Sequence, residues 1–294
     1  MSTRTAPAAG PHEPAVRRRP LLRRLTTRNN VLFTLCLSCL ALLVLAAVLA
    51  PWISPHDPNS IDFSTALADP SPQRLLGGDI TGRDTLSRLL LGARISLLGP
   101  LCVVVLSTVA GLLVGVTAAW RGGIVDTLLS RSSELVLAFP GLLLAMLLVA
   151  LYGRGPVAPV LALSVAYIPY VSRLARSLAL SEMNKPYLSA YTLQGFSGWW
   201  VCLRHLLPNI APVVLAQSAV NFGYALLDLA SLSYLGLGTP PLEPDWGTMV
   251  NEGQSAILDG RPLSAAIPCL AIVLTVVTFN VVSERIADTV ARRP

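Results

Sequence analysis

Six stretches of the chain run for about 20 residues each without a single charged side chain. They cover residues 31–50, 95–120, 135–153, 155–172, 206–227 and 262–283. A helix needs about 20 mainly apolar residues to cross the hydrocarbon core of a bilayer. A membrane β-barrel strand would alternate apolar and polar residues, whereas these stretches are continuously apolar. We therefore predict an all-α membrane protein with six transmembrane helices.

The composition excludes the two common alternatives to a membrane protein. Hydrophobic residues make up 53% of the 294 residues and charged residues only 13%, with a mean hydropathy of +0.62. A soluble domain has roughly 25% charged residues, so an ordinary water-soluble enzyme is disfavoured. Disordered chains combine low hydrophobicity with high charge, which is the opposite of this balance.

Two features of these stretches concern the start of the chain and one connection between spans. The first stretch is longer than the roughly 7–15 apolar residues of a signal-peptide core, so we expect a retained anchor helix over 31–53. The third and fourth are so close that they must be joined by a tight turn at 153–156.

The basic residues predict the orientation. With six spans, sixteen of the 22 Lys and Arg residues fall on the side of both termini and six on the other side. Cytoplasmic loops carry the excess of Lys and Arg, so both termini are predicted in the cytoplasm. The Arg-rich tail 1–30 is expected to lie against anionic lipid. The net charge of +6 is thus a topology signal, and we expect no nucleic-acid partner.

Residue types that support catalysis or metal binding are sparse. The five cysteines are mostly within apolar stretches, the three histidines are scattered, and Lys185 is the only lysine. No G-x-x-x-x-G-K-[ST] loop surrounds Lys185, so the chain has no Walker A nucleotide site. No zinc, serine or paired-carboxylate arrangement is present either. We expect a chain that is not an enzyme and binds no metal or cofactor.

The first outer loop carries the glycine-rich, charged stretch Leu-Gly-Gly-Asp-Ile-Thr-Gly-Arg-Asp-Thr-Leu-Ser-Arg at 76–88. Its acidic residues do not have the spacing of a calcium loop. The residues alone indicate a solvated loop in which the Asp and Arg side chains pair locally.

The long inner loop predicts two short helices. Pro186 near the first helical position and Gly195 just past the last are typical of a short helix. Ser197 is placed to cap a second one, and Pro208 marks the start of the fifth span. Tyr187 and Tyr191 are four residues apart and share a helix face. Exposed aromatic residues here favour either a covering partner or the aromatic belt of the membrane interface.

Four polar residues fall within the predicted spans. Asp228 lies near the outer end of the fifth span, where an ionisable side chain indicates a functional site. The alternative is structural pairing with an arginine such as Arg94 or with partner backbone. Gln217, Asn221 and Asn280 also have two interpretations. They line a pathway, or they join helices by hydrogen bonds. On the inner side, Arg131 and Glu134 are spaced to pair on one helix face.

Several of these segments together resemble one family. Residues 76–97 resemble the pattern L-G-T-D-x-x-G-R-D-x-x-S-R-x-x-x-G-x-R-x-S-L, with Gly78 at the Thr position. Residues 121–126 followed by Leu-Ala-Phe-Pro at 137–140, and 231–238 followed by Pro240, Pro241, Asp245, Trp246 and Gly247, continue the likeness. They resemble the inner-membrane permeases of ATP-binding-cassette importers, specifically the C-type subunit of the dipeptide/oligopeptide/nickel family. The likeness runs from about residue 76 to 285.

The resemblance assigns a role to the inner loop. Residues 189–195 are similar to the family motif E-A-A-x-x-x-G, with Ser189 at the Glu position and Tyr191 at the second Ala. In that family this loop forms coupling helices that seat in a groove of the ATPase. The residues so implied are Tyr187, Leu188, Ser189, Ala190, Tyr191, Gly195 and Pro208. The outer-loop motif residues are Gly77, Asp79, Gly82, Arg83, Asp84, Ser87 and Arg88.

The resemblance also implies a fold, a function and partners. The fold is the type I ABC importer permease, divided into a basic tail (1–30), an anchor helix (31–53), an outer loop (54–94), a five-helix core (95–285) with coupling loop 178–208, and a tail (286–294). The chain would form half of an inward peptide pathway in the cytoplasmic membrane of a prokaryote. Its partners would be a homologous B-type permease, two ATPases that bind ATP and Mg, an extracytoplasmic solute-binding protein and membrane lipid.

Two other transport functions are alternatives. A permease for nickel or another metal chelate belongs to the same family and is disfavoured only by the lack of a His or Cys cluster. An ion-coupled secondary transporter would need internal repeats and broken helices with ion ligands at mid-membrane, and no convincing repeat is present.

Overall fold

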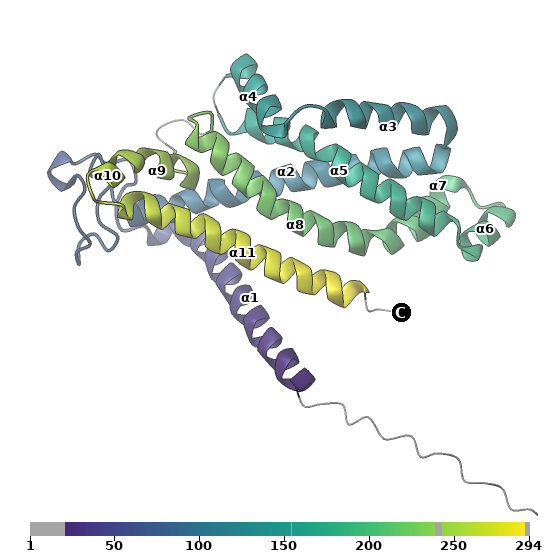
Figure 1. Ribbon diagram of the computed structural model, residues 1–294, viewed down its shortest axis with the longest axis horizontal. Helices are drawn as coiled ribbons and strands as arrows, with labels where there is room; N and C mark the ends of the chain where they lie inside the picture. The colour runs from purple at the N-terminus through teal and green to yellow at the C-terminus, as the bar shows by residue number, and fades with distance from the viewer. Residues whose placement is uncertain (1–20, 154, 239–242, 292–294) are drawn as a thin grey trace, which may run out of the picture.

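The computed structural model describes residues 21–153, 155–238 and 243–291. All regular elements in this part of the chain are helices (Figure 1). Most of the basic tail 1–30 lies outside this description. The long helices are α1 (Leu21–Ile53), α2 (Thr85–Arg121), α5 (Val157–Met183), α8 (Leu207–Tyr234) and α11 (Leu263–Ala291). The shorter elements are η1 (Phe63–Thr65), α3 (Gly123–Leu137), α4 (Gly141–Tyr152), α6 (Pro186–Leu193), α7 (Gly198–Val201), the π-helical turn η2 (Cys202–Leu206), α9 (Trp246–Glu252) and α10 (Gln254–Leu258).

The long helices form a bundle with two different ends. Figure 1 shows α6 and α7 at one end of the long axis and α9, α10 and the loop before α2 at the other. Helix α1 leans away from the bundle and contacts α2 and α11. Among the described residues, five helical segments are long and apolar enough to cross a membrane, and there are six if the bent pair of α3 and α4 is one span. The all-α membrane fold with five or six spans is therefore confirmed.

The third span is not the single helix predicted over 135–153. It is a broken pair, α3 and α4, bent by 82°. Pro140 precedes α4, and a proline both lacks an N–H and disfavours helical backbone in the residue before it. At 1.5 Å per residue the 12 residues of α4 extend about 18 Å, less than the bilayer core of about 30 Å. The connection predicted next is short, since α4 ends at Tyr152 and α5 begins at Val157. Residue 154 of the predicted turn lies outside the described residues.

Helix α3 lies against α2 and α5 and is fixed there by an ion pair. The guanidinium of Arg176 on α5 donates two hydrogen bonds of 2.6 Å to the carboxylate of Asp126 on α3. The pairing predicted between Arg131 and Glu134 is also present, with an N–O distance of 3.1 Å. It is exposed, however, and lies within α3, whereas the Asp126–Arg176 pair joins two helices.

Helix α2 begins at Thr85, ten residues before the uncharged stretch. Asp84 is its N-cap, and Oδ2 of Asp84 accepts a hydrogen bond from the backbone N–H of Ser87 at 2.9 Å. A carboxylate at this position satisfies backbone donors that the first turn leaves unpaired. The outer loop predicted over 54–94 is therefore shorter than expected, and the charged motif continues into the helix.

Two glycines let α2 and α5 approach each other closely. A Cβ atom at Gly115 would lie 2.3 Å from the backbone oxygen of Ser172, and one at Gly111 would lie 2.6 Å from Cβ of Val171. The two glycines form a G-x-x-x-G spacing, which in membranes marks helix faces that pack backbone to backbone. This spacing is visible in the sequence, and the sequence-based prediction missed it.

Candidate functional site

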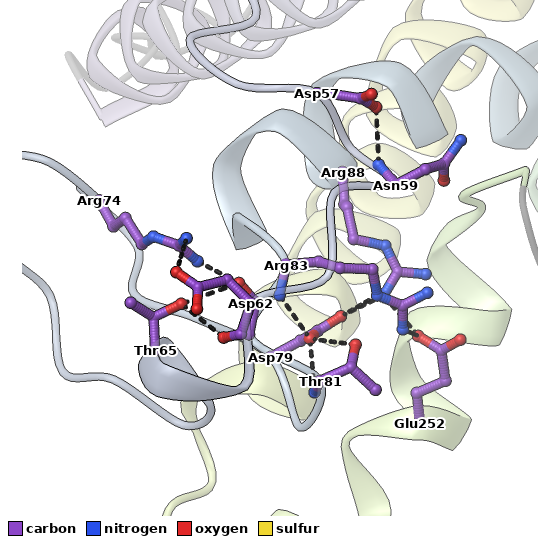
Figure 2. A network of polar contacts seen from close by, with 11 residues as sticks. Asp57, Asn59, Asp62, Thr65, Arg74, Asp79, Thr81, Arg83, Arg88 and Glu252 are labelled. Atoms are coloured by element: carbon purple, nitrogen blue, oxygen red, sulfur yellow. Dashed lines mark hydrogen bonds and ion pairs between the residues drawn. The ribbon is translucent and has the colours of Figure 1, made fainter.

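The end of the molecule with α9 and α10, which is the outer end in the predicted orientation, contains a network of two carboxylates and two guanidinium groups (Figure 2). Nε of Arg83 donates to Oδ2 of Asp79 at 2.8 Å, and Nη2 of Arg83 donates to Oε2 of Glu252 at 2.8 Å. Arg88 places Nη1 at 2.5 Å from oxygens of the same two carboxylates. We call Asp79, Arg83, Arg88 and Glu252 the outer ion-pair network. It joins the loop before α2 to the last residue of α9.

Burial distinguishes this network from the solvated, locally paired loop that the sequence indicated. The Arg88 side chain is only 2% exposed, and Asp79 and Arg83 are also buried. Burial opposes ionisation of Asp79, but the guanidinium groups of Arg83 and Arg88 outweigh it and hold the pKa of this carboxyl below its usual value. The predicted local pairing is present, and the structure adds Glu252, far away in the sequence.

Glycines give the loop its shape. Gly77 and Gly82 have φ angles of 75° and 78°, and a Cβ atom at Gly82 would lie 1.8 Å from the backbone oxygen of Asp62. Gly78, the position where the family pattern has Thr, would place a Cβ atom 2.3 Å from the backbone oxygen of Thr65. In this chain the backbone at Thr65 occupies the space that a larger residue at 78 would need.

The remaining motif residues lock the start of α2. Ser87 donates its hydroxyl to Oδ2 of Asp84 at 2.6 Å and accepts the backbone N–H of His56 at 3.1 Å. Asp84 and Ser87 are both buried. The seven outer-loop motif residues thus build one compact structure that holds the loop on the end of the bundle.

The stretch after the fifth span completes this outer end. Trp246 is buried, and its ring nitrogen donates to the backbone oxygen of Leu89 at 3.0 Å. Asp245 caps α9 by accepting the N–H groups of Gly247 and Thr248. Helix α9 is therefore held directly against the start of α2, next to the outer ion-pair network.

The opposite end carries the predicted coupling loop, and both of its short helices are present. Helix α6 begins at Pro186 as expected, and Ser197 caps α7 by accepting the N–H of Trp200 at 3.3 Å. Gly195, with φ of 82°, follows the end of α6. The structure differs at Pro208: α7, η2 and α8 form one continuous helical segment, so α8 does not begin with a break.

Tyr187 faces the bundle rather than the solvent. Its hydroxyl donates to Oε1 of Glu182 at 2.5 Å and accepts from Nδ2 of Asn209 at 2.6 Å. Glu182 belongs to α5 and Asn209 to α8. Burial and the Glu182 carboxylate raise the pKa of Tyr187 to about 12. This residue fastens α6 to two spans.

Tyr191 is likewise an internal contact of the loop. Its ring stacks on the His205 ring at a centroid distance of 4.2 Å and meets Trp200 edge-on at 6.0 Å. Leu188 is also buried. The side chains of Tyr187, Leu188 and Tyr191 therefore hold the loop together. Their membership of a coupling loop that docks on an ATPase stays a prediction.

Other residues of the loop are exposed instead. Leu193 is 88% exposed, Trp199 and Leu203 are exposed as well, and Ala190, Gly195 and Pro208 lie on the surface. The side chain of Ser189 lies outside the described part. The sequence did not separate the inward from the outward aromatic residues, since both types share the loop.

A cavity of about 690 Å³ lies between α4, α5 and α8. Phe139, Tyr167, Tyr170, Tyr224 and Asp228 contribute to its lining. Oδ2 of Asp228 accepts a hydrogen bond from the hydroxyl of Tyr167 at 2.9 Å. In the described structure the contact of Asp228 is thus a tyrosine on the neighbouring helix and not Arg94, the arginine named in the alternative interpretation. Pairing with partner backbone stays a prediction.

The predicted polar residues of the spans separate into two groups. Gln217 and Asn221 line the cavity, and Nε2 of Gln217 donates to Oδ1 of Asn221 at 3.2 Å on the same helix. Asn280 on α11 is instead packed near Gly223 of α8, away from the cavity lining. Among the described residues no three His, Cys, Asp or Glu side chains are grouped to hold a metal ion.

Known families match both parts of the chain. The family described as the binding-protein-dependent transport system inner membrane component matches residues 107–294. The family described as the N-terminal TM domain of oligopeptide transport permease C matches residues 22–70.

Curated relatives cover most of the chain. A Brucella suis protein bearing the name of a peptide transport system permease is 37% identical over 266 residues, 90% of this chain and 88% of the relative. The di/tripeptide transport system permease protein DppC of Pseudomonas aeruginosa is 36% identical, over 84% of this chain and 83% of its own length. Among solved structures, the inward-facing MetNI methionine ABC transporter matches with a TM-score of 0.57 and 18% identity, over 70% of this chain and 97% of that one. That likeness shows the type I ABC importer permease fold.

Proposed function

Since the chain belongs to the family of inner membrane components of binding-protein-dependent transport systems, we propose that it forms half of the pathway of an ATP-driven peptide importer. The peptide substrate is supported by the relatives, which include permeases for peptides and for di- and tripeptides. The observation that supports the transport mechanism is the arrangement of α6 and α7. One face of these helices exposes side chains to solvent, and the other contacts the bundle.

The exposed surface is suited to docking on a partner. Leu193 and Trp199 lie at the end of the bundle with their side chains uncovered. Apolar side chains gathered at one surface are typical of protein–protein contact. We propose that an ATPase subunit covers this surface, with Ala190, Leu193 and Gly195 nearest to it.

The inward contacts give the docked loop a route to the spans. Tyr187 connects α6 to α5 and α8, and the Tyr191–His205 stack connects α6 to η2. Because α7, η2 and α8 are one helical segment, a displacement of α7 is transmitted along α8. ATP-driven closure of the ATPases would then rock the bundle as a rigid body between outward and inward openings.

The partners supply what this chain lacks. We propose a homologous B-type permease for the other half of the pathway and an extracytoplasmic solute-binding protein that delivers the peptide. Two ATPase subunits bind ATP and Mg, and no residue of this chain performs covalent chemistry. Its division into an anchor helix at 31–53 and a core at 95–285 and the cytoplasmic placement of both termini are part of the same proposal.

The docking assignment is tested by Leu193→Asp. A buried apolar contact that receives a charge is strongly destabilised, so co-purification of the ATPases with the permease pair should fall at least tenfold. ATP-driven uptake of radiolabelled peptide into proteoliposomes should fall in parallel. The matched control is Leu258→Asp, since Leu258 is 87% exposed and lies on α10 at the opposite end of the molecule.

Two results would contradict the proposal. Normal ATPase co-purification with Leu193→Asp would show that α6 is not a docking surface. The solute carried by the binding protein purified with the complex tests the substrate separately: peptide supports the proposal, and a metal chelate would move the protein to the nickel-type branch of the family.

A further inference from the structure

The cavity between α4, α5 and α8 holds an acidic side chain that forms no ion pair with the described part of the chain. The described contact of the Asp228 carboxylate is the hydrogen bond from Tyr167, and no Lys or Arg is among the residues that line the cavity. A carboxylate within a membrane-spanning helix is costly when no cation balances its charge. The site is therefore electrostatically suited to a positively charged ligand.

Aromatic rings surround the same position. Tyr170 and Tyr224 line the cavity and are each 60% exposed, so their rings are available for contact. The Tyr167 and Tyr170 rings are tilted against each other at a centroid distance of 6.0 Å. Ammonium groups are attracted to the faces of aromatic rings, most strongly where water is scarce. The combination of one carboxylate with several tyrosines favours an ammonium ion.

A polar group suited to the rest of a peptide lies along the same helix. Nδ2 of Asn221 is buried without a hydrogen-bond partner, while Oδ1 of Asn221 is taken by Gln217. Asn221 and Asp228 are seven residues apart on α8, which corresponds to about 10.5 Å along the helix axis. An extended tripeptide spans about 10 Å. An unused donor and a carboxylate whose described contact is a neutral hydroxyl thus lie at a separation that a short peptide can bridge.

We propose that this cavity is a peptide subsite of the translocation pathway, in which Asp228 binds the α-ammonium group and Asn221 donates to a backbone oxygen of the peptide. The cavity volume lies within the range of roughly 300–1,000 Å³ that small-ligand sites occupy. The inference rests on the proposed function and specifies how the permease, as distinct from the binding protein, recognises its substrate.

The test compares trialanine with N-acetyl-trialanine, which lacks the ammonium group. The complete transporter is reconstituted in proteoliposomes with the permease as wild type, Asp228→Asn, Asp228→Glu, or the control Asp259→Asn on the exposed outer surface. Peptide concentrations are chosen to load the binding protein, and uptake is expressed per loaded binding protein. The binding protein is the same in every sample, so its own preference cancels between variants.

We expect Asp228→Asn to lower trialanine uptake at least tenfold and to leave the slower uptake of N-acetyl-trialanine unchanged. Asp228→Glu should retain much of the trialanine uptake, and Asp259→Asn should match the wild type. Equal losses for both peptides, unaltered uptake by Asp228→Asn, or equal wild-type uptake of both peptides would each overturn the subsite. Failure of Asp228→Asn alone to assemble with its partners would identify a pairing carboxylate and would overturn it too.

The same experiment separates this inference from the proposed function. If the wild-type complex takes up no peptide at all, the proposed peptide import fails. If it takes up trialanine normally and Asp228→Asn does the same, peptide import stands and only the subsite is wrong.

Discussion

Arg88 shows how a single side chain can join distant parts of this chain. Arg88 lies in the first turn of α2, and its guanidinium contacts both Asp79 in the preceding loop and Glu252 at the end of α9. Two positive and two negative groups are balanced in the outer ion-pair network. Removal of one partner from such a buried group leaves an uncompensated charge, which costs more than the pair itself contributes.

The substitution Glu252→Gln tests this balance. It removes one negative charge with almost no change in shape, and the two arginines are then left with one carboxylate. We expect the free energy of unfolding to fall by about 2–4 kcal/mol. This is somewhat less than for a fully buried ion pair, because the Glu252 side chain is 20% exposed. Thermal unfolding of the purified protein in detergent should show a clearly lower Tm.

The same chemical change at Glu134 is the control. Glu134 pairs with Arg131 on the exposed face of α3, where an ion pair contributes at most about 1 kcal/mol. If Glu134→Gln lowers the Tm as much as Glu252→Gln does, burial does not set the strength of the outer network.

At the level of helices, the third span shows that a local breaker and a long-range contact act together. Pro140 ends helical continuity between α3 and α4. The Asp126–Arg176 pair then holds α3 against α5, so the two halves point in different directions. Neither feature alone would position α3, because a proline permits many bend directions.

The α2–α5 contact leads to a prediction at the same scale. In an ordinary helix Gly→Ala is stabilising by roughly 0.5–1 kcal/mol. At Gly115 the sign should reverse, because the new Cβ atom would lie 2.3 Å from the backbone oxygen of Ser172. Overpacking of this kind costs about 1–3 kcal/mol. We expect Gly115→Ala to lower both the Tm and the yield of folded protein.

Gly141→Ala provides the comparison. Its added Cβ atom would lie 3.4 Å from Cβ of Ala166, which is an ordinary van der Waals distance. A Gly115→Ala protein as stable as Gly141→Ala would show that α2 and α5 are not packed backbone to backbone.

Helix α8 connects the functional regions of the molecule. It continues α7 at one end, lines the cavity with Asn221 and Asp228, and packs against α9 at the other end. A Cβ atom at Gly247 of α9 would lie 2.4 Å from the backbone oxygen of Ala230 on α8, so this outer contact is close. The exposed coupling surface and the buried outer ion-pair network thus lie at opposite ends of one connected bundle (Figure 1).

This arrangement requires a definite orientation in the membrane, which reporter fusions test. The distribution of Lys and Arg predicts that α6 and α7 lie in the cytoplasm. Alkaline phosphatase, active only outside the cytoplasm, should be active when inserted at residue 72 and inactive when fused after residue 294. A fluorescent protein that matures only in the cytoplasm should show the opposite pattern. Activity of the phosphatase at residue 294 would contradict the orientation.

Local chemistry in the sequence was sufficient for most of the spans and for the two short helices α6 and α7. Uncharged stretches marked the five long membrane helices and the α4 half of the bent pair, and Pro186 and Ser197 marked the starts of α6 and α7. These features depend on residues within a few positions of each other, since helix capping and membrane insertion act over one or two turns. They are therefore readable in a linear chain.

The direction in which each side chain points was decided only in the folded chain. Glu252 joins Arg88 from 164 positions away, Asp228 meets Tyr167 rather than Arg94, and Tyr191 turns inward while Leu193 stays exposed. Each outcome depends on which helices become neighbours and how closely they pack. Helix packing is set by many side-chain shapes at once, so the partners of a charged or aromatic residue are determined by the assembled bundle.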